Sequence, residues 1–205
     1  MFNGNKLVVI LPTLLMILLF AGGGFYITQA EIVTNDELDE HVKWDTSFEE
    51  NQKSAILDAS WSWEVSPEDG FAGNDYIGVT ILDDNGEIIN SDSIQHYDIQ
   101  IGENESVEAE AETVENGVLF TFPNTMLENK TVGNEGSIAV EINGEAEPER
   151  AIISYLHTWE EHNGLDSKDA RFFERDFSGK GNDDESFFWV MERFVNVEGQ
   201  NRGAG

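Results

Sequence analysis

The N-terminal residues form an uninterrupted apolar segment. Leu7 to Ile27 contains no charged residue, and this length is enough to cross the hydrocarbon core of a bilayer, which is about 30 Å thick. Lys6 precedes the segment, and the first acidic residue of the chain, Glu31, follows it. Basic residues tend to stay on the cytoplasmic side of a membrane helix. The pattern therefore predicts a single-pass helix with the C-terminal domain outside the cell.

A cleavable signal peptide explains the same segment. Its apolar part would run from Leu7 to Phe20, and the small-residue site Thr28-Gln29-Ala30 would be cut before Glu31. Pro12 weakens the helix, as do the glycines that follow Phe20, although membrane helices tolerate both residue types. Residues 1–30 are thus either a membrane anchor or a signal segment. Cleavage after Ala30 would make the chain a secreted protein.

From Ser54 onward the hydrophobic period changes to two, which is typical of half-buried strands. The first such stretch has its apolar positions at Leu57, Ala59, Trp61, Trp63 and Val65. Further strands are predicted at 76–82, 87–90, 94–101, 107–111, 118–122, 138–142 and 151–159. Asn85-Gly86 separates the second and third of these stretches and indicates a tight hairpin, because both central residues of such a turn need positive φ.

These short strands, without helical crossovers between them, predict a mainly β protein with an antiparallel β-sandwich at residues 54–163. An immunoglobulin-like topology fits the pattern, but strand order is not contained in it. Both tryptophans of the first strand, Trp61 and Trp63, are expected to pack in the core or at a sheet edge rather than to form a ligand platform.

Two flanking segments have other patterns. Residues 31–53 are polar and acidic and are predicted to form a stalk or short helix. Residues 164–197 show apolar spacings of three and four behind capping residues such as Asp166 and Asp183, which predicts a pair of short helices packed on the sandwich. The glycine-rich residues 198–205 are expected to be a flexible tail.

The charge of the chain restricts its environment and its partners. The chain has 41 acidic residues against 11 Lys plus Arg, a formal net charge of -30. Nucleic-acid binding is excluded, because phosphate contacts need a basic surface. Such a charge repels itself at ordinary ionic strength and is screened in molar salt. The composition therefore indicates a halophilic archaeon or bacterium. The absence of cysteine excludes disulfides and thiolate sites.

One acidic stretch resembles an EF-hand calcium loop in its spacing. Its oxygen-bearing side chains and the central Gly179 fall at the positions where such loops place ligands and a sharp turn. The calcium candidates are Glu174, Asp176, Ser178, Lys180, Asn182 and Glu185. The match is incomplete, because the first position is Glu rather than Asp and the chain has no second loop to pair with.

Other motifs are less specific. The spacing of His157 and His162 matches no zinc-protease signature. Asn104 and Asn129 begin Asn-Xaa-Ser/Thr acceptor patterns for glycans, which fits an outside location. The chain contains no nucleophile elbow, phosphate-binding glycine loop or dinucleotide fingerprint.

These features favour a non-enzymatic, membrane-anchored extracytoplasmic protein. The expected partners are the lipid bilayer and another envelope or surface protein. A secreted or anchored module that binds a small ligand or calcium is the alternative, and an extracytoplasmic hydrolase is a third hypothesis. No resident cofactor is expected other than calcium.

Raising NaCl from about 0.1 M to about 1 M should increase the melting temperature of the protein, because the screening length falls from about 10 Å to about 3 Å. Calorimetry would measure this. Salt also strengthens apolar burial, so the series should be repeated near the isoelectric point of about 4.1. There the increase should be much smaller. An equal increase at both pH values would contradict charge repulsion as the cause.

Overall fold

The computed structural model describes residues 6–27, 32–51, 53–102, 107–127, 130–179 and 187–198. The chain divides into two compact units, Met1–Val33 and Thr34–Gly205. The first unit contains helix α1 (Lys6–Ile27), which includes Pro12. No helix within the described residues has both the length and the apolar character needed to cross a membrane. The choice between anchor and signal segment therefore stays a prediction.

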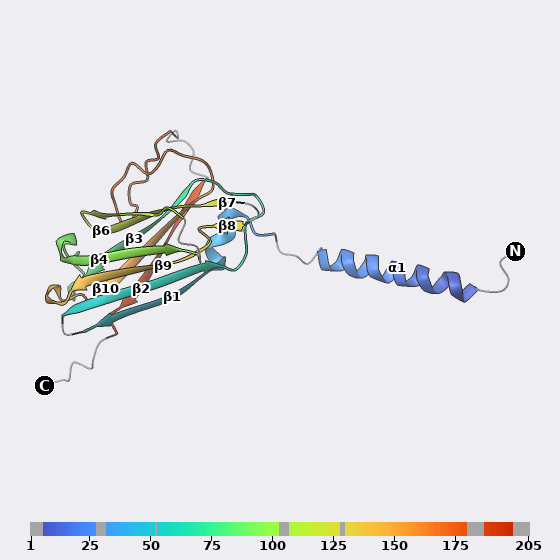
Figure 1. Cartoon of the computed structure of the whole chain (residues 1–205), viewed down its shortest axis with the longest axis horizontal. Coiled ribbons are helices and arrows are strands. Elements are labelled where there is room, and N and C mark those ends of the chain that lie inside the picture. Colours follow the sequence, from blue (N-terminus) through green and yellow to red (C-terminus); the bar gives the residue numbers. More distant parts are fainter. Residues whose placement is uncertain are drawn as a thin grey trace. The chain divides into compact units, whose positions relative to one another are not determined.

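The second unit is built from two antiparallel sheets and a small ribbon (Figure 1). Sheet A has the order β1 (Val42–Glu50), β2 (Ser54–Trp63), β9 (Glu135–Asn143), β4 (Ile94–Ile101). Sheet B has the order β11 (Phe188–Asn196), β10 (Arg150–Thr158), β3 (Asn74–Leu82), β6 (Gly117–Pro123), β5 (Glu110–Val114). The ribbon pairs β7 (Thr125–Leu127) with β8 (Lys130–Val132), and the 3-10 turns are η1 (Asn35–His41), η2 (Ser91–Ser93) and η3 (Gly144–Ala146). The mainly β prediction is confirmed.

The two sheets enclose one hydrophobic core in a sandwich-like arrangement. The inward positions of β2 alternate with outward polar ones, and Trp61 and Trp63 are both buried there, as expected. The core joins Leu57 on β2 and Val140 on β9 to Val79 and Ile153 on the facing sheet. Burial of apolar surface on this scale is the main favourable term in folding. The period-two pattern therefore identified the faces correctly.

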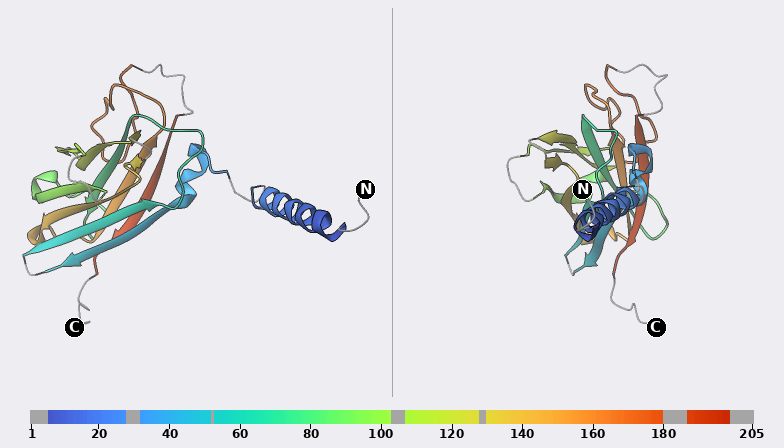
Figure 2. Two further views of the ribbon diagram at one scale, coloured as in Figure 1. Left: turned by 45° about the vertical axis from the view of Figure 1, so that its right-hand side comes forward. Right: turned by 90° about the vertical axis from the view of Figure 1, so that its right-hand side faces the viewer.

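The centre of sheet B is buried on both faces. Side chains of β10 are buried almost without interruption from Ala151 to Thr158. On the outer face, a second apolar cluster includes Tyr76 and Leu156 from the sheet and Ala170 and Phe172 from the chain between β10 and β11. The described part of this connecting chain is the brown segment in Figure 2. We call its described part from 159 to 179 the covering segment.

The predicted C-terminal helical pair is wrong. The described residues of the covering segment contain turns and the isolated bridge between Leu165 and Phe177, and Phe188–Asn196 is strand β11, paired with β10. Trp189 and Met191 of β11 pack on the sandwich core, whereas Phe188 and Val190 pack on the second cluster. A strand that is apolar on both faces has no clear period of two and is easily mistaken for a helix.

The prediction of an acidic stalk or short helix at residues 31–53 is also wrong in part. The turn η1 is short, and the next nine residues form strand β1, which pairs with β2 from Val42↔Trp63 to Glu50↔Ala55. Acidic side chains occupy outward positions of β1, such as Asp45 and Glu49. The segment is therefore polar on average, which resembles a stalk more than a strand. The sandwich therefore begins before residue 54 and ends after residue 163.

The two remaining local predictions have mixed outcomes. At the expected hairpin, Gly86 has φ 82° and Leu82 bridges Ile88, but the return strand is only this bridge. In the predicted tail, the backbone N–H of Glu198 donates to the carbonyl of Phe48 at 2.7 Å, so residue 198 still belongs to the sandwich. Residues 199–205 lie outside the described part.

Gly78 lies beneath the covering segment, where a Cβ would come within 1.8 Å of the carbonyl oxygen of Ala170. Gly78→Ala should therefore displace this segment, at a cost of about 1 to 3 kcal/mol in unfolding free energy. Limited trypsin digestion should show faster cleavage after Lys168, Arg171 or Arg175.

The control is Gly86→Ala. No atom lies within 4 Å of its Cβ position, although the positive φ adds strain. Cleavage of the covering segment should not change in this variant. Equal cleavage in both variants would contradict the role of Gly78.

Candidate functional site

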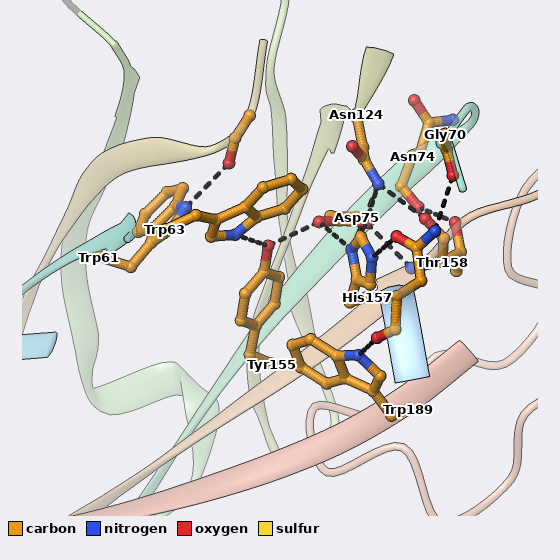
Figure 3. A network of polar contacts seen from close by, with 12 residues as sticks. Trp61, Trp63, Gly70, Asn74, Asp75, Asn124, Tyr155, His157, Thr158 and Trp189 are labelled. Atoms are coloured by element: carbon orange, nitrogen blue, oxygen red, sulfur yellow. Dashed lines mark hydrogen bonds and ion pairs between the residues drawn. The ribbon is translucent and has the colours of Figure 1, made fainter. Parts of the chain in front are cut away.

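The most concentrated polar chemistry in the described residues surrounds Asp75, whose side chain is fully buried. Its Oδ1 accepts hydrogen bonds from the backbone N–H of Thr158 at 3.0 Å and from Asn124 Nδ2 at 2.9 Å. Its Oδ2 accepts from the Tyr155 hydroxyl at 2.6 Å and lies 3.0 Å from His157 Nδ1. Figure 3 shows these groups converging on the carboxylate. The Asp75 carboxyl group therefore accepts from three protein donors and faces the His157 ring.

Both ring nitrogens of His157 face acceptors. Nδ1 faces the Asp75 carboxylate at 3.0 Å and also lies 3.2 Å from Asn124 Nδ2, which donates to Asp75 Oδ1 and to the carbonyl of Thr158. Nε2 lies 3.0 Å from Asn35 Oδ1. The orientation of the Asn35 amide follows from its Nδ2, which donates to Asp69 Oδ1 at 2.8 Å and to the carbonyl of Gly70 at 2.7 Å. A histidine that donates from both nitrogens is doubly protonated. We infer that His157 and Asp75 form a buried ion pair.

The fold brings these residues together from four distant segments. Asp75 and His157 lie at neighbouring positions of the paired strands β3 and β10, next to the pair Tyr76↔Leu156. Asn124 directly follows β6, which is the other neighbour of β3. Asn35 is the first residue of η1. The network thus fastens the beginning of the second unit to the centre of sheet B.

Aromatic rings surround the ion pair. The rings of Trp63, Trp159 and Trp189 have centroids 5.1, 5.8 and 4.9 Å from that of His157. Aromatic faces stabilise a nearby cation, especially where water is excluded. Trp189 also donates from Nε1 to the carbonyl of Asn35 at 2.8 Å. These rings shield the pair from solvent, which strengthens its electrostatic attraction.

The Tyr155 hydroxyl extends the network toward the sandwich core. Burial, together with the neighbouring Asp75 charge, raises the pKa of Tyr155 well above 10. Tyr155 is therefore protonated at neutral pH and donates to Asp75. Its oxygen accepts from Trp63 Nε1 at 3.3 Å. The hydroxyl thus has partners on both sides.

Asp, His and Tyr are residue types that act in acid–base catalysis, but here their geometry favours a structural role. The side chains of Asp75 and His157 are both 0% exposed, and their polar atoms are bonded to protein groups. A substrate would have to displace these bonds to reach them. Asn124 Oδ1 is the one atom of the network that is buried without a partner among the described residues. The arrangement stabilises the fold.

The calcium candidates are only partly described. Ser178 donates from its hydroxyl to Asp166, and Asp176 accepts at its backbone carbonyl from the N–H of Asp166 at 2.8 Å. Glu174 lies in the same turn region, whereas Lys180, Asn182 and Glu185 lie outside the described residues. The helix–loop–helix frame of an EF-hand is contradicted by β11 on one flank. Calcium binding itself stays a prediction.

Histidines 157 and 162 do not face a common ligand position. His157 is bonded as described above, while His162 contacts the Tyr76 hydroxyl through Nε2 at 3.0 Å and the Glu160 carbonyl through Nδ1 at 3.0 Å. The described residues contain no group of three or more His, Asp or Glu that is placed to hold a metal ion. The glycosylation candidates Asn104 and Asn129 lie outside the described residues.

The outer face of sheet A carries a solvent-facing hollow. Its volume is about 280 Å³, and it is lined mainly by small polar side chains and by three aspartates, Asp45, Asp58 and Asp98. It contains no aromatic platform and no buried polar group aimed into it. The hollow therefore does not identify a ligand.

The sequence reasoning missed the Asp75 network entirely. The sequence feature that could have indicated it is a titratable residue in or beside an apolar strand. His157 lies within the apolar stretch 151–159, and Asp75 immediately precedes the stretch 76–82. A buried charge needs a partner, so two such positions on strands suggest a pair. Their pairing depends on β3 and β10 being neighbours, which the pattern does not contain.

Comparison with known proteins identifies no family. No family model matches the chain, and no curated protein matches it. Among solved structures, the chain is similar to AvmM, which is described as catalysing macrocyclization in alchivemycin A biosynthesis. The TM-score is 0.35 and the identity 8%, over 80% of this chain and 92% of that chain. A likeness this distant carries no argument about function.

Asp75→Asn should reduce the free energy of unfolding by about 3 to 5 kcal/mol, because it leaves the His157 cation buried without its counter-ion. Tyr155→Phe removes one neutral donor and should cost less, about 1 to 2 kcal/mol. Urea denaturation at constant salt would measure both values.

Thr80→Val is the matched control. Thr80 is buried on the same strand, and its hydroxyl has no partner among the described residues. The change preserves shape and should leave the free energy of unfolding within about 1 kcal/mol of the original. If Asp75→Asn costs no more than Thr80→Val, the proposed ion pair is wrong.

Proposed function

We propose that this chain is a membrane-anchored extracytoplasmic protein whose β-sandwich takes part in protein interaction or assembly at the surface or envelope of a high-salt organism. The observation that carries the proposal is the distribution of charge along the chain. Leu7 to Ile27 has no charge, whereas all 41 acidic residues follow residue 30. An uncharged segment of this length suits a bilayer, and the acidic domain suits water and salt.

The sealed polar network supports an interaction role over catalysis. The side chains of Asp75 and His157 have no exposed surface, and the Tyr155 hydroxyl is bonded to Asp75. An enzyme needs such groups within reach of a substrate, whereas a binding module needs a rigid frame. The buried ion pair supplies rigidity to that frame.

We also propose that the sandwich is a variant of the immunoglobulin-like topology. Constant-type immunoglobulin domains place strands ABED in one sheet and CFG in the other. Here β1, β2, β9 and β4 form one sheet, and β3, β10 and β11 are neighbours in the other. In chain order these seven strands follow A to G, with β5 and β6 added beside β3. This agreement concerns the fold, and function does not follow from it.

If the anchor is retained, mass spectrometry of the protein purified from native membranes should find the N-terminal peptide that contains Lys6. Recovery from the medium of a chain that begins at Glu31 would contradict the anchor. Ala30→Leu is the control variant, because signal peptidase requires a small residue at this position. It should change nothing in an anchored protein, whereas it would retain a normally cleaved protein in the membrane.

The outside location has its own readout within the same experiment. The chain has no cysteine, so Ile88→Cys, at a side chain that is 49% exposed, introduces a single reactive thiol. A membrane-impermeant maleimide should label this thiol in intact cells. Labelling only after cell lysis would contradict the proposed orientation.

A further inference from the structure

Two exposed phenylalanines are connected through a bonded Arg–Glu pair whose side chains are 23% and 27% exposed. Phe173 and Phe194 are 65% and 59% exposed. The Arg171 guanidinium lies 4.6 Å from the centre of the Phe173 ring and donates to both Glu192 oxygens, at 2.9 and 3.0 Å. Glu192 and Phe194 are two residues apart on β11, which places their side chains on one face about 7 Å apart. We call these four residues the aromatic stripe.

The backbone beneath one end of the stripe is firmly held. Asp169 accepts from the backbone N–H of Arg171 at 2.9 Å and of Phe173 at 2.7 Å, and its side chain is bonded by Asn116 Nδ2 at 2.6 Å. Burial of Asp169 opposes its ionisation, but these three hydrogen bonds prevail and lower its pKa. Phe172, between the two stripe residues, is buried at φ 56°. The stripe is therefore presented by a defined turn.

The chemistry of the stripe is symmetric about its centre. Its order is aromatic, positive, negative, aromatic, so a rotation of 180° places each group opposite a group that complements it. Phe173 would meet Phe194 of a second copy, and Arg171 would meet Glu192 of that copy. A two-fold dimer requires this relation, in which residue i contacts j and j contacts i.

Charge makes this the favourable place for a second copy to bind. A chain with a net charge of -30 repels its own copies over most of its surface. Within the stripe itself, Arg171 balances Glu192, so its four side chains carry no net charge. Among the described residues of the second unit, the other large apolar side chains that are exposed are Val65, Ile88 and Met126, which come from separate parts of the sandwich. We propose that a second copy of this chain docks on the aromatic stripe to form a two-fold dimer.

The dimer proposal rests on the proposed function in one respect, because both assume that the domain binds another protein. It does not depend on whether residues 1–30 anchor the chain. Failure of the membrane experiment would leave the dimer intact, and a monomeric protein with a retained N-terminus would remove the dimer alone. The two proposals are thus distinguishable.

The first test uses the full chain in mild detergent and about 1 M NaCl, with cysteines introduced into a chain that has none. Phe173→Cys combined with Phe194→Cys should form a covalent dimer on mild oxidation, because each thiol would lie opposite its counterpart in the second copy. Ile88→Cys is the control and should stay monomeric on denaturing gels. Equal cross-linking in both proteins would overturn the proposal.

The second test is sedimentation of single variants in the same buffer. Phe194→Asp adds a repelling charge at an exposed position and should weaken dimerisation at least tenfold. Met126→Asp makes the same change at a side chain that is 53% exposed, outside the stripe, and should leave the dimer unchanged. Both variants keep helix α1, so association through that helix would persist in both. A monomeric original protein, or equal dimerisation of the two variants, would overturn the proposal.

Discussion

The ion pair between Asp75 and His157 is the interaction on which the organisation of the sandwich depends. It lies where β3, β10, the end of β6 and the beginning of η1 meet, and each of these segments contributes a partner. Removing a carboxylate and an imidazolium from water costs several kcal/mol per ion, and only a complete set of hydrogen bonds offsets that cost. The pair is therefore stable only when all four segments are in register. We infer that this condition favours the native register over other arrangements of the apolar core.

The two-sided burial of sheet B follows from the same centre. Tyr155 and His157 point from β10 toward the sandwich, while Leu156 points to the opposite face beneath the covering segment. The covering segment approaches so closely over Gly78 that only glycine fits there. It also contributes Arg171 and Phe173 to the outer surface. The ion-pair network and the aromatic stripe thus belong to opposite faces of one sheet. The network lies on its inner face, and the covering segment packs on its outer face and contributes two residues of the stripe.

The acidic surface and the neutral stripe have complementary roles in the proposed function. A net charge of -30 keeps copies apart and favours a screened, salty medium. A protein with this surface needs a locally balanced area in order to bind another acidic protein. The pairing of Arg171 with Glu192 provides that balance between two phenylalanines.

The sequence by itself determined the character of the elements. Alternation along β2, β4 and β9 predicted strands because side chains of a strand point to opposite faces with a period of two. The sequence also determined where the uncharged N-terminal segment lies and that the acidic residues all follow it. The period of two does not identify β11, because both of its faces are apolar. It does not identify β1 either, because polar and acidic residues outnumber its few apolar positions.

Only the tertiary structure decided the candidate site. Asp75 and His157 are 82 residues apart, and Asn35 and His157 are 122 apart. Their contact requires β3 and β10 to be neighbours and η1 to pack against β11, and strand order is set by the packing of the whole core. Arg171 and Glu192 likewise meet only because β11 is a strand beside β10. Local patterns describe which face of a strand is apolar, whereas the partner of a polar side chain depends on the fold.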